Sequence, residues 1–142
     1  MPRRVEQQPE FFVDRSLGRH VVPEALRQLG LTVHTMVDVY PGGEDQRVAD
    51  TRWIADADAA GWVALTKDER IYRDPENQAT LVNSQLRVFA IANQHLTGPQ
   101  MAEYFARNIN RLVQRARRRG PFVDVVYRAS VERRWPREPP RR

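Results

Sequence analysis

The chain has 142 residues, of which 41% are hydrophobic and 29% charged, and it contains no cysteine. This length suits one domain with a single core, and the composition is typical of a folded, water-soluble protein. The missing cysteines exclude a disulfide framework and a thiolate metal site, and no apolar run is long enough to span a bilayer. The first ten residues, MPRRVEQQPE, lack the apolar core of a signal peptide, so we expect a cytoplasmic protein with no membrane partner.

The net charge of +5 is unevenly distributed along the chain. Residues 107–142 hold 12 arginines and three acids, a net charge of +9, whereas the first 106 residues carry a net charge of −4. A basic C-terminal part on an acidic body is a plausible binding surface for a polyanion. Because arginine outnumbers lysine by 22 to 1, biased codon usage would also explain much of this excess. Charge alone therefore favours nucleic-acid contact only slightly.

The first ninety residues predict strands that alternate with helices. Hydrophobic, β-branched runs predict the strands, and hydrophobic residues three or four apart predict the helices. In chain order we expect a strand at 10–14, a helix at 22–30, a strand at 31–39, a helix from Asp50 to about residue 60, a strand at 62–66 and a strand at 87–92. Asp50 is the expected N-cap of the second helix, and Gly61 its end. Such alternation indicates βαβ units and a parallel sheet that is covered on both faces.

The remaining residues predict one long helix and one last strand. Residues 97–119 form the helix, with Thr97 as N-cap and an apolar stripe of Met101, Phe105, Ile109, Leu112 and Ala116. Gly120-Pro121 ends this helix, and residues 122–131 follow as a strand. The predicted fold class is a three-layer α/β/α sandwich with a central, mostly parallel sheet. It forms a single domain at 10–135, between a flexible N-terminus (1–9) and a basic, disordered tail (136–142).

Acidic residues recur at the carboxyl ends of the predicted parallel strands. Asp14 closes the first strand, Asp68 follows strand 62–66 by two residues, and Asp50 opens the helix that leads into that strand. Sites in parallel α/β sheets form in the crevice beyond these strand ends, so we expect the three carboxylates to lie close together. Grouped carboxylates repel one another unless a cation is present, and their oxygens are typical ligands of Mg²⁺ or Mn²⁺.

Each of these acids also has a purely structural interpretation. Asp14 and Asp68 are typical of turns, and Asp50 is a good helix cap whatever else it does. Glu44 and Asp45, in the preceding loop, are alternatives to Asp50 or additions to it. Only the recurrence of acids at one predicted edge favours a metal site over three separate structural roles.

Other kinds of site lack a supporting pattern. The three histidines, His20, His34 and His95, do not have the spacing of zinc ligands. Gly42-Gly43 is an isolated pair and not a phosphate-binding loop, and no Ser/His/Asp arrangement is persuasive. Clustered carboxylates with a metal ion are the chemistry that remains.

Two stretches of the sequence, FFVDRSLGRHVVPEALRQLG (11–30) and DTRWIADADAAGWVALTKDERI (50–71), resemble the compact PIN-like domains. These include the VapC-type nucleases of toxin–antitoxin systems. In that family pattern an acid ends the first strand, a second Asp opens a helix three residues ahead of a hydrophobic pair, and a hydrophobic strand ends in T-x-D. Asp14, Asp50 and Asp68 match these positions, and the spacing from Asp50 to the strand fits better than the spacing from Asp45.

The resemblance covers roughly residues 10–92, and more loosely the long helix and last strand. It implies a metal-dependent endoribonuclease, with Asp14, Asp50 and Asp68 as catalytic residues and ligands of Mg²⁺ or Mn²⁺. It also implies an RNA substrate and a cognate antitoxin protein, and a homodimer is compatible with it. PIN-like domains often add a fourth acid from a later helix. Here only Glu76 and Glu103 are available in the 75–119 region, with Glu69 as a substitute.

Basic residues flank the candidate ligands in sequence. Arg15, Arg19, Lys67 and Arg70 are expected to draw the RNA backbone to a site whose own charge would repel it, although they are equally suited to a solvated surface. The basic end of the long helix, Arg115 and Arg117 to Arg119, is a second candidate RNA contact.

Two alternative functions remain open at this stage. The chain could be a noncatalytic RNA- or protein-binding module derived from a PIN-like nuclease, as the absence of an obvious fourth acid suggests. A phosphoacceptor receiver-like domain also uses clustered acids and Mg²⁺. That class needs paired acids after the first strand, however, and here Asp14 is followed by Arg15.

Overall fold

The computed structural model of the chain describes residues 8–137 and contains a six-stranded sheet in the order β2-β1-β3-β4-β5-β6. The strands are β1 (Phe11–Val13), β2 (Val33–Thr35), β3 (Val63–Thr66), β4 (Arg87–Ile91), β5 (Phe122–Val126) and β6 (Val131–Trp135). The α-helices are α1 (Val21–Gln28), α2 (Met36–Val39), α3 (Asp50–Ala60), α4 (Pro75–Val82), α5 (Gly98–Arg107) and α6 (Ile109–Ala116). Short 3-10 helices lie at η1 (Arg15–Leu17), η2 (Glu44–Gln46) and η3 (Ile71–Arg73).

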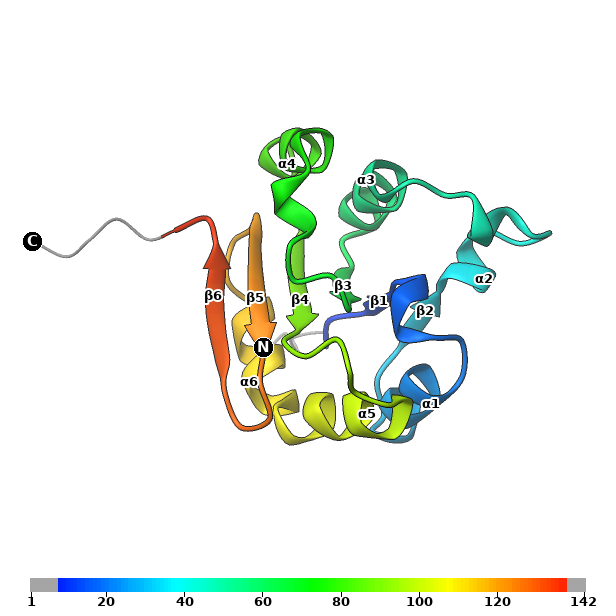
Figure 1. The fold of residues 1–142 in the computed structure, drawn as a ribbon, viewed down its shortest axis with the longest axis vertical. Helices are drawn as coiled ribbons and strands as arrows, with labels where there is room; N and C mark the ends of the chain where they lie inside the picture. The colour runs from blue at the N-terminus through cyan, green and yellow to red at the C-terminus, as the bar shows by residue number, and fades with distance from the viewer. Residues whose placement is uncertain (1–7, 138–142) are drawn as a thin grey trace, which may run out of the picture.

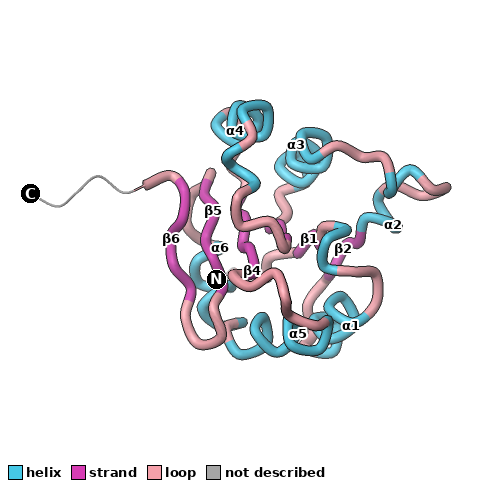
Figure 2. The backbone as a smooth tube through the Cα atoms, in the orientation of Figure 1, coloured by secondary structure: helices cyan, strands magenta, loops and turns pink. Residues whose placement is uncertain are grey.

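The first five strands are parallel, and β6 runs antiparallel to β5. Helices α3 and α4 cover one face of this sheet, and α1, α5 and α6 cover the other (Figure 1). Figure 2 shows the same two helix layers with the strands between them. The predicted three-layer sandwich with a mostly parallel sheet is therefore confirmed. Most of the predicted N-terminal segment (1–9) and basic tail (136–142) lies outside the described residues.

Alternating residues of the strands divide the core into two clusters. Val63 and Leu65 of β3 pack on the side of α1, α5 and α6, whereas Ala64 between them packs on the side of α3 and α4. The largest side chain of the second cluster, Trp53 of α3, is 1% exposed and stacks on Phe12 of β1. Both faces of the parallel strands are thus apolar, as burial on both sides requires. Among residues 8–137, no helix is long and apolar enough to cross a membrane.

The predicted strand at 31–39 is shorter than expected. It ends at Thr35, and Met36–Val39 form the short helix α2 instead. The hydroxyl of Thr35 accepts a hydrogen bond from the backbone N–H of Asp38 (3.2 Å) and so caps this helix. Thr can cap a helix as well as occupy a strand, and here the capping bond favours the helix.

The predicted helix at 97–119 is two helices, α5 and α6, which meet at Asn108. Thr97 is the N-cap, as predicted, and forms a capping box with Gln100. Asn108 is fully buried, and its side-chain amide donates to the carbonyls of Tyr104, Tyr127 and Arg128 at 2.8, 2.8 and 3.2 Å. The break in the helix therefore brings an amide donor to the chain that leaves β5.

The predicted strand at 122–131 is a hairpin of two strands, β5 and β6. Asp124 of β5 is fully buried, and its two carboxylate oxygens accept hydrogen bonds from Arg115 of α6 and Arg133 of β6, each at 2.7 Å. These two cations balance a buried charge that would otherwise be strongly unfavourable. Arg115, a predicted RNA contact, is thus engaged in an internal ion pair.

Helix α4 was not predicted, although its start has a clear signal. Asp74 accepts hydrogen bonds from the backbone N–H groups of Glu76 and Asn77, and Pro75 occupies the first turn. An Asp cap followed by Pro is a typical helix start. This helix packs against α3 and places the side chain of Asn77 next to Asp50.

The strand order places a switch point at β1. The chain leaves β1 for β2 on one side, and β3 lies on the other side. A crevice forms outside the carboxyl ends of strands at such a point, because the connections leave in opposite directions. Asp14, after β1, and Thr66, the last residue of β3, lie at this position.

Candidate functional site

Asp14 is the most buried of the three candidate metal ligands. It is 8% exposed, and its Oδ2 accepts hydrogen bonds from the hydroxyls of Ser16 (2.8 Å) and Thr66 (2.9 Å). Burial raises the pKa of Asp14 above its ordinary value of 3.8, the nearby charge of Asp50 raises it further, and the two hydroxyl groups act in the opposite direction. The carboxyl of Asp14 thus lies in a partly dry environment beside a second negative charge.

Asp50 opens α3, but it is the first helical residue and not the N-cap, a position taken by Ala49. Its carboxylate makes no capping bond to the backbone. Instead, Oδ1 accepts a hydrogen bond from the indole N–H of Trp53 (2.9 Å), and Oδ2 accepts one from the side-chain amide of Asn77 (3.3 Å). The purely structural interpretation of Asp50 as a helix cap is therefore not realised.

Asp14 and Asp50 together form a pair of carboxylates without a cationic partner among residues 8–137. All four of the side chains that bond them, Ser16, Thr66, Trp53 and Asn77, are neutral donors. Most other acids of the described chain, by contrast, contact an arginine or histidine. Two neighbouring carboxylates in this setting favour the binding of a cation.

Asp68 lies close in the fold but has a different environment. It is exposed, and its Oδ1 accepts a hydrogen bond from the backbone N–H of Arg70 (3.0 Å). Its own backbone N–H donates to the hydroxyl of Thr66 (3.1 Å), the same hydroxyl that donates to Asp14. Over residues 8–137, no group of three Asp, Glu, His or Cys side chains is placed so that it could hold a metal ion. The assignment of Asp68 as a ligand therefore stays a prediction.

A cavity of about 370 Å³ adjoins Asp68. Lys67 and Arg70, two of the predicted RNA contacts, line it together with Ser16 and Gln94. Ser16 accepts a hydrogen bond from the backbone N–H of Lys67 (2.9 Å) while it donates to Asp14. The hydroxyl of Ser16 therefore joins the cavity to the buried carboxylate.

The other two predicted RNA contacts, Arg15 and Arg19, both contact Asp45. Arg19 forms an ion pair with the Asp45 carboxylate (3.0 Å), and Arg15 donates to the Asp45 carbonyl. The Asp45 side chain is 5% exposed, and Gln46 also donates to it (2.9 Å). In this conformation Asp45 is thus neutralised by Arg19, whereas Asp14 and Asp50 are not neutralised by any residue between 8 and 137.

Three of the four remaining candidate acids contact arginines, and one of these, Glu69, also lines the cavity beside Asp68. Glu44 lies 4.0 Å from Arg52, and Glu69 lies 3.7 Å from Arg134. Glu103 contacts Arg107 and Arg128. For Glu76, the structure records no ion pair within the described part of the chain.

Sequence reasoning assigned no role at this site to three polar residues, Ser16, Thr66 and Asn77, although Thr66 belongs to the T-x-D motif. Ser and Thr are so common at strand ends and turns that their presence carries little signal. Asn77 is 7% exposed, and a buried Asn usually has a specific hydrogen-bond partner. It was missed because helix α4 was missed.

The residues at this edge fit a divalent cation of the Mg²⁺ class. Such a cation commonly takes one or two protein carboxylates and completes its octahedron with waters and substrate phosphates, so a complete protein cage is not required. Asp14 and Asp50 supply two hard oxygen ligands, and the hydroxyls and the amide around them hold these carboxylates in place. The ligand chemistry is therefore appropriate without a fourth acid.

Comparison with known proteins gives two matches. The sequence model described as "PIN like domain" matches residues 9–93, which include all three candidate ligands. The protein named "Putative ribonuclease VapC45" of Mycobacterium tuberculosis is 32% identical over 123 residues, which cover 87% of this chain and 89% of that protein. No solved structure matches the chain significantly.

The raised pKa of Asp14 predicts how stability depends on pH. An acid with a raised pKa in the folded state favours folding below its unfolded value of 3.8, and this contribution is lost as the pH rises through the folded pKa. We therefore expect Asp14→Asn to match or exceed the wild type in thermal stability at neutral pH. This advantage should shrink as the pH falls toward 3.8. Thermal unfolding followed across pH measures it.

Asp38→Asn provides a control of opposite sign. The hydroxyl of Thr35 and the guanidinium of Arg27 lower the pKa of Asp38, so its contribution is present at neutral pH and is lost on acidification. This variant should be slightly less stable than the wild type at neutral pH and equal to it in acid. An Asp14→Asn variant with the same pH dependence as Asp38→Asn would contradict the assignment of Asp14 as a destabilised carboxylate.

Proposed function

The chain belongs to the PIN-like domain family, and from this premise we propose that it is a metal-dependent endoribonuclease, the toxin of a toxin–antitoxin pair. The observation that carries the proposal is the pair Asp14 and Asp50, two neighbouring carboxylates that are bonded only by neutral donors. Membership of the family and the resemblance to a protein named as a ribonuclease support RNA as the substrate.

In this proposal Asp14, Asp50 and Asp68 hold Mg²⁺ or Mn²⁺. When it is bound, the cation supplies an acidified water as nucleophile and neutralises charge at the scissile phosphate. The side chain of Asp68 is exposed and bonded only to a backbone N–H, so it can turn toward the metal once RNA enters. The hydroxyl of Thr66 fixes the position of Asp14 relative to Asp68, because it donates to the Asp14 carboxylate and accepts from the backbone N–H of Asp68.

The basic residues have two roles in this proposal. Lys67 and Arg70 line the cavity beside Asp68, where they would contact the phosphates next to the scissile bond. Arg15 and Arg19 hold the loop that carries Asp45 and reach the RNA with the part of each side chain that stays exposed; Arg19 is 53% exposed. A basic rim of this kind offsets the repulsion between RNA and the acidic pair.

Purified protein should cleave RNA when Mg²⁺ or Mn²⁺ is added and stop when EDTA is present. The cleavage rate should fall at least about a hundredfold in each of the variants Asp14→Asn, Asp50→Asn and Asp68→Asn. Loss of a residue that only supports a metal ligand costs up to about a hundredfold, and loss of the ligand itself should cost no less. Cleavage of labelled RNA on denaturing gels measures this rate.

The matched control is Glu132→Gln, which removes one exposed acid from β6, a strand that is not adjacent to β1 or β3 in the sheet, and should leave cleavage unchanged. If the Asp14→Asn and Asp68→Asn variants cut as well as the wild type, the site assignment is wrong. RNA binding with no cleavage in any metal would instead favour the alternative of a noncatalytic binding module.

We further propose that Asn77 positions Asp50. Its amide donates to Oδ2 of Asp50 while the indole of Trp53 donates to Oδ1, so both oxygens are bonded on the protein side. Asn77 is buried at the start of α4, where the Asp74 cap fixes its backbone. A neutral donor at this point orients the carboxylate without neutralising it, which leaves the negative charge available for the metal.

Asn77→Ala should therefore weaken Mn²⁺ binding about tenfold, within the range found for outer-shell partners of metal ligands. Titration calorimetry measures this affinity without reference to cleavage. Asn83→Ala is the control, because Asn83 ends the same helix and its side chain bonds only a backbone carbonyl of that helix. Equal Mn²⁺ affinity in Asn77→Ala and the wild type would contradict the positioning role.

The family also leads us to propose a cognate antitoxin protein that blocks the site. We expect the product of a neighbouring reading frame to co-purify with this chain and to suppress RNA cleavage at equimolar concentration. Co-expression followed by size-exclusion chromatography and a cleavage assay tests both parts. If the neighbouring product binds but leaves cleavage unchanged, it is a partner and not an antitoxin.

A further inference from the structure

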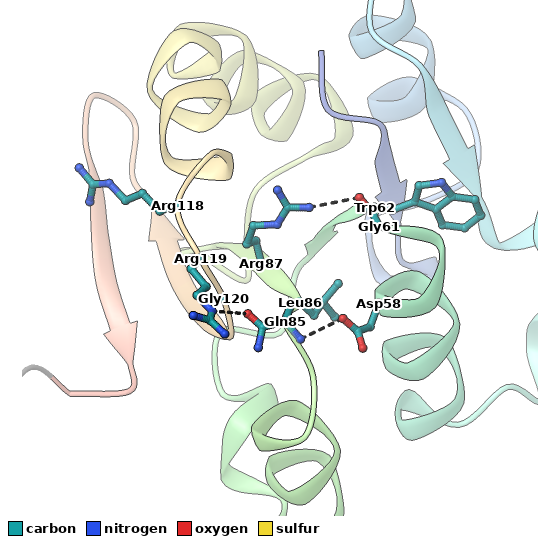
Figure 3. A pocket seen from close by; sticks show the side chains of 9 residues that line it. All are labelled: Asp58, Gly61, Trp62, Gln85, Leu86, Arg87, Arg118, Arg119 and Gly120. Atoms are coloured by element: carbon teal, nitrogen blue, oxygen red, sulfur yellow. Dashed lines mark hydrogen bonds between the residues drawn. The ribbon is translucent and has the colours of Figure 1, made fainter. Parts of the chain in front are cut away.

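A second cavity lies at the opposite edge of the sheet from Asp14 and Asp68. It has a volume of about 220 Å³ and is formed where β3 and β4 begin and where the chain enters β5 (Figure 3). Strand β3 separates it from the candidate metal site, a length of about 13 Å for four residues at about 3.3 Å each. The two sites therefore lie at opposite ends of the same parallel strands.

Three of the residues that line this cavity are arginines: Arg87, Arg118 and Arg119. Arg87 donates to the carbonyls of Gly61 and Ala116, and Arg119 donates to the side-chain carbonyl of Gln85 (3.3 Å). All of these acceptors are neutral. Within residues 8–137 the structure records no ion pair for any of the three arginines, so their charges are not balanced by a carboxylate in contact.

One acid, Asp58, lines the same cavity, and its Oδ1 accepts a hydrogen bond from the backbone N–H of Gln85 (2.9 Å). The lining residues therefore carry three positive charges and one negative charge, and the side chain of Arg118 points away from Arg87 and Arg119 (Figure 3). Burial lowers the pKa of Arg87, and the charge of Asp58 acts in the opposite direction. A half-buried cation that is incompletely compensated favours the binding of an anion.

Gly120, which follows Arg118 and Arg119, packs its backbone against that of Gln85 and Leu86 on the other side of the cavity. A Cβ atom at Gly120 would lie 2.3 Å from the carbonyl oxygen of Gln85 and 2.8 Å from that of Leu86, so only glycine permits this approach. The N–H of Phe122 also donates to the Leu86 carbonyl (3.1 Å). Arg118 and Arg119 are thus carried on a segment that is packed backbone to backbone with the start of β4.

We propose that this arginine cavity is a second RNA-binding site, which takes a backbone phosphate of an RNA that is also engaged at the candidate metal site. Guanidinium groups bind phosphate through paired N–H donors, and the site lies in the strongly basic C-terminal part of the chain. Because the two sites lie at opposite edges of the sheet, the RNA must be long or folded enough to reach both. The inference rests on the proposed function for its ligand, but its test does not need cleavage.

A phosphate backbone fits this cavity better than an acidic protein segment does. The three arginines of this cavity carry charged hydrogen-bond donors, whereas Trp62 and Leu86 are its only large apolar members and Leu86 is 1% exposed. Protein interfaces gain much of their affinity from buried aromatic and aliphatic side chains, whereas nucleic-acid binding depends mainly on charge. We therefore expect the binding affinity of the occupant to depend strongly on salt concentration.

The experiment measures binding of folded transfer RNA to the full chain in EDTA, where no cleavage takes place under the proposed mechanism. Arg118→Glu/Arg119→Glu should lower the affinity at least about tenfold and reduce the slope of log affinity against log salt by about two. Asp58→Asn should act in the opposite direction and raise the affinity. Fluorescence anisotropy with labelled RNA gives both quantities.

The matched control is Arg107→Glu/Arg128→Glu, which changes the net charge by the same amount. These two arginines are exposed and both contact Glu103, outside the cavity. The control should keep an affinity within about twofold of the wild type, as expected for phosphate contacts that are local. Arg118→Glu alone provides a further test, since it removes no side-chain contact that the structure records for residues 8–137.

The outcomes separate this inference from the proposed function. If the Arg118 and Arg119 variants bind RNA like the wild type, or if the control loses as much affinity as they do, the second site is wrong even when RNA is cleaved. If the variants lose affinity although the wild type cuts no RNA in any metal, the second site stands and the nuclease proposal fails. In an active protein, the variants should raise KM for long RNA and leave kcat unchanged.

Discussion

The candidate site is defined by the repulsion between two carboxylates, those of Asp14 and Asp50. They come from different elements, β1 and α3, and the fold brings them together where the sheet connections diverge. Neutral donors hold them from several directions, so they are oriented but not neutralised. A pair of this kind costs stability in the isolated chain, and binding of a cation offsets the cost. Under the proposed function, metal binding and the stability of the fold are therefore coupled at this point.

The carboxyl ends of β1 and β3 are linked by hydroxyl groups and not by charges. Thr66 donates to Asp14 and accepts from the backbone of Asp68, and Ser16 donates to Asp14 and accepts from the backbone of Lys67. Each hydroxyl oxygen thus donates one hydrogen bond and accepts another at the same atom, and it does so without carrying a charge. Arginine could not replace them, because it would neutralise the pair that they position.

How well the sequence predicted the structure depended on whether the signal was local. The strand Val63–Thr66 and the start of α3 at Asp50 were predicted to within one residue, because apolar runs and their boundaries are set by neighbours in the chain. The breaks at Thr35 and Asn108 were missed. Both depend on one polar side chain that finds a backbone partner, and at Asn108 two of the three partners come from beyond β5. The bonds of Asn77 and Thr66 to the acids were missed for the same reason. A hydroxyl or an amide has many possible partners, and only the folded arrangement selects one.

The two outer strands of the sheet bear on how copies of this chain can associate. At one side, β2 has only three residues and passes directly into a helix; at the other, β6 carries three consecutive charged residues, Glu132, Arg133 and Arg134. A very short strand and a charged strand are poor templates for a further strand, so neither edge favours growth of the sheet from one molecule into the next. A homodimer of this protein, if it forms, is therefore expected to be joined through its helices or loops. The Asp14–Asp50 pair of each copy would then lie in a separate sheet.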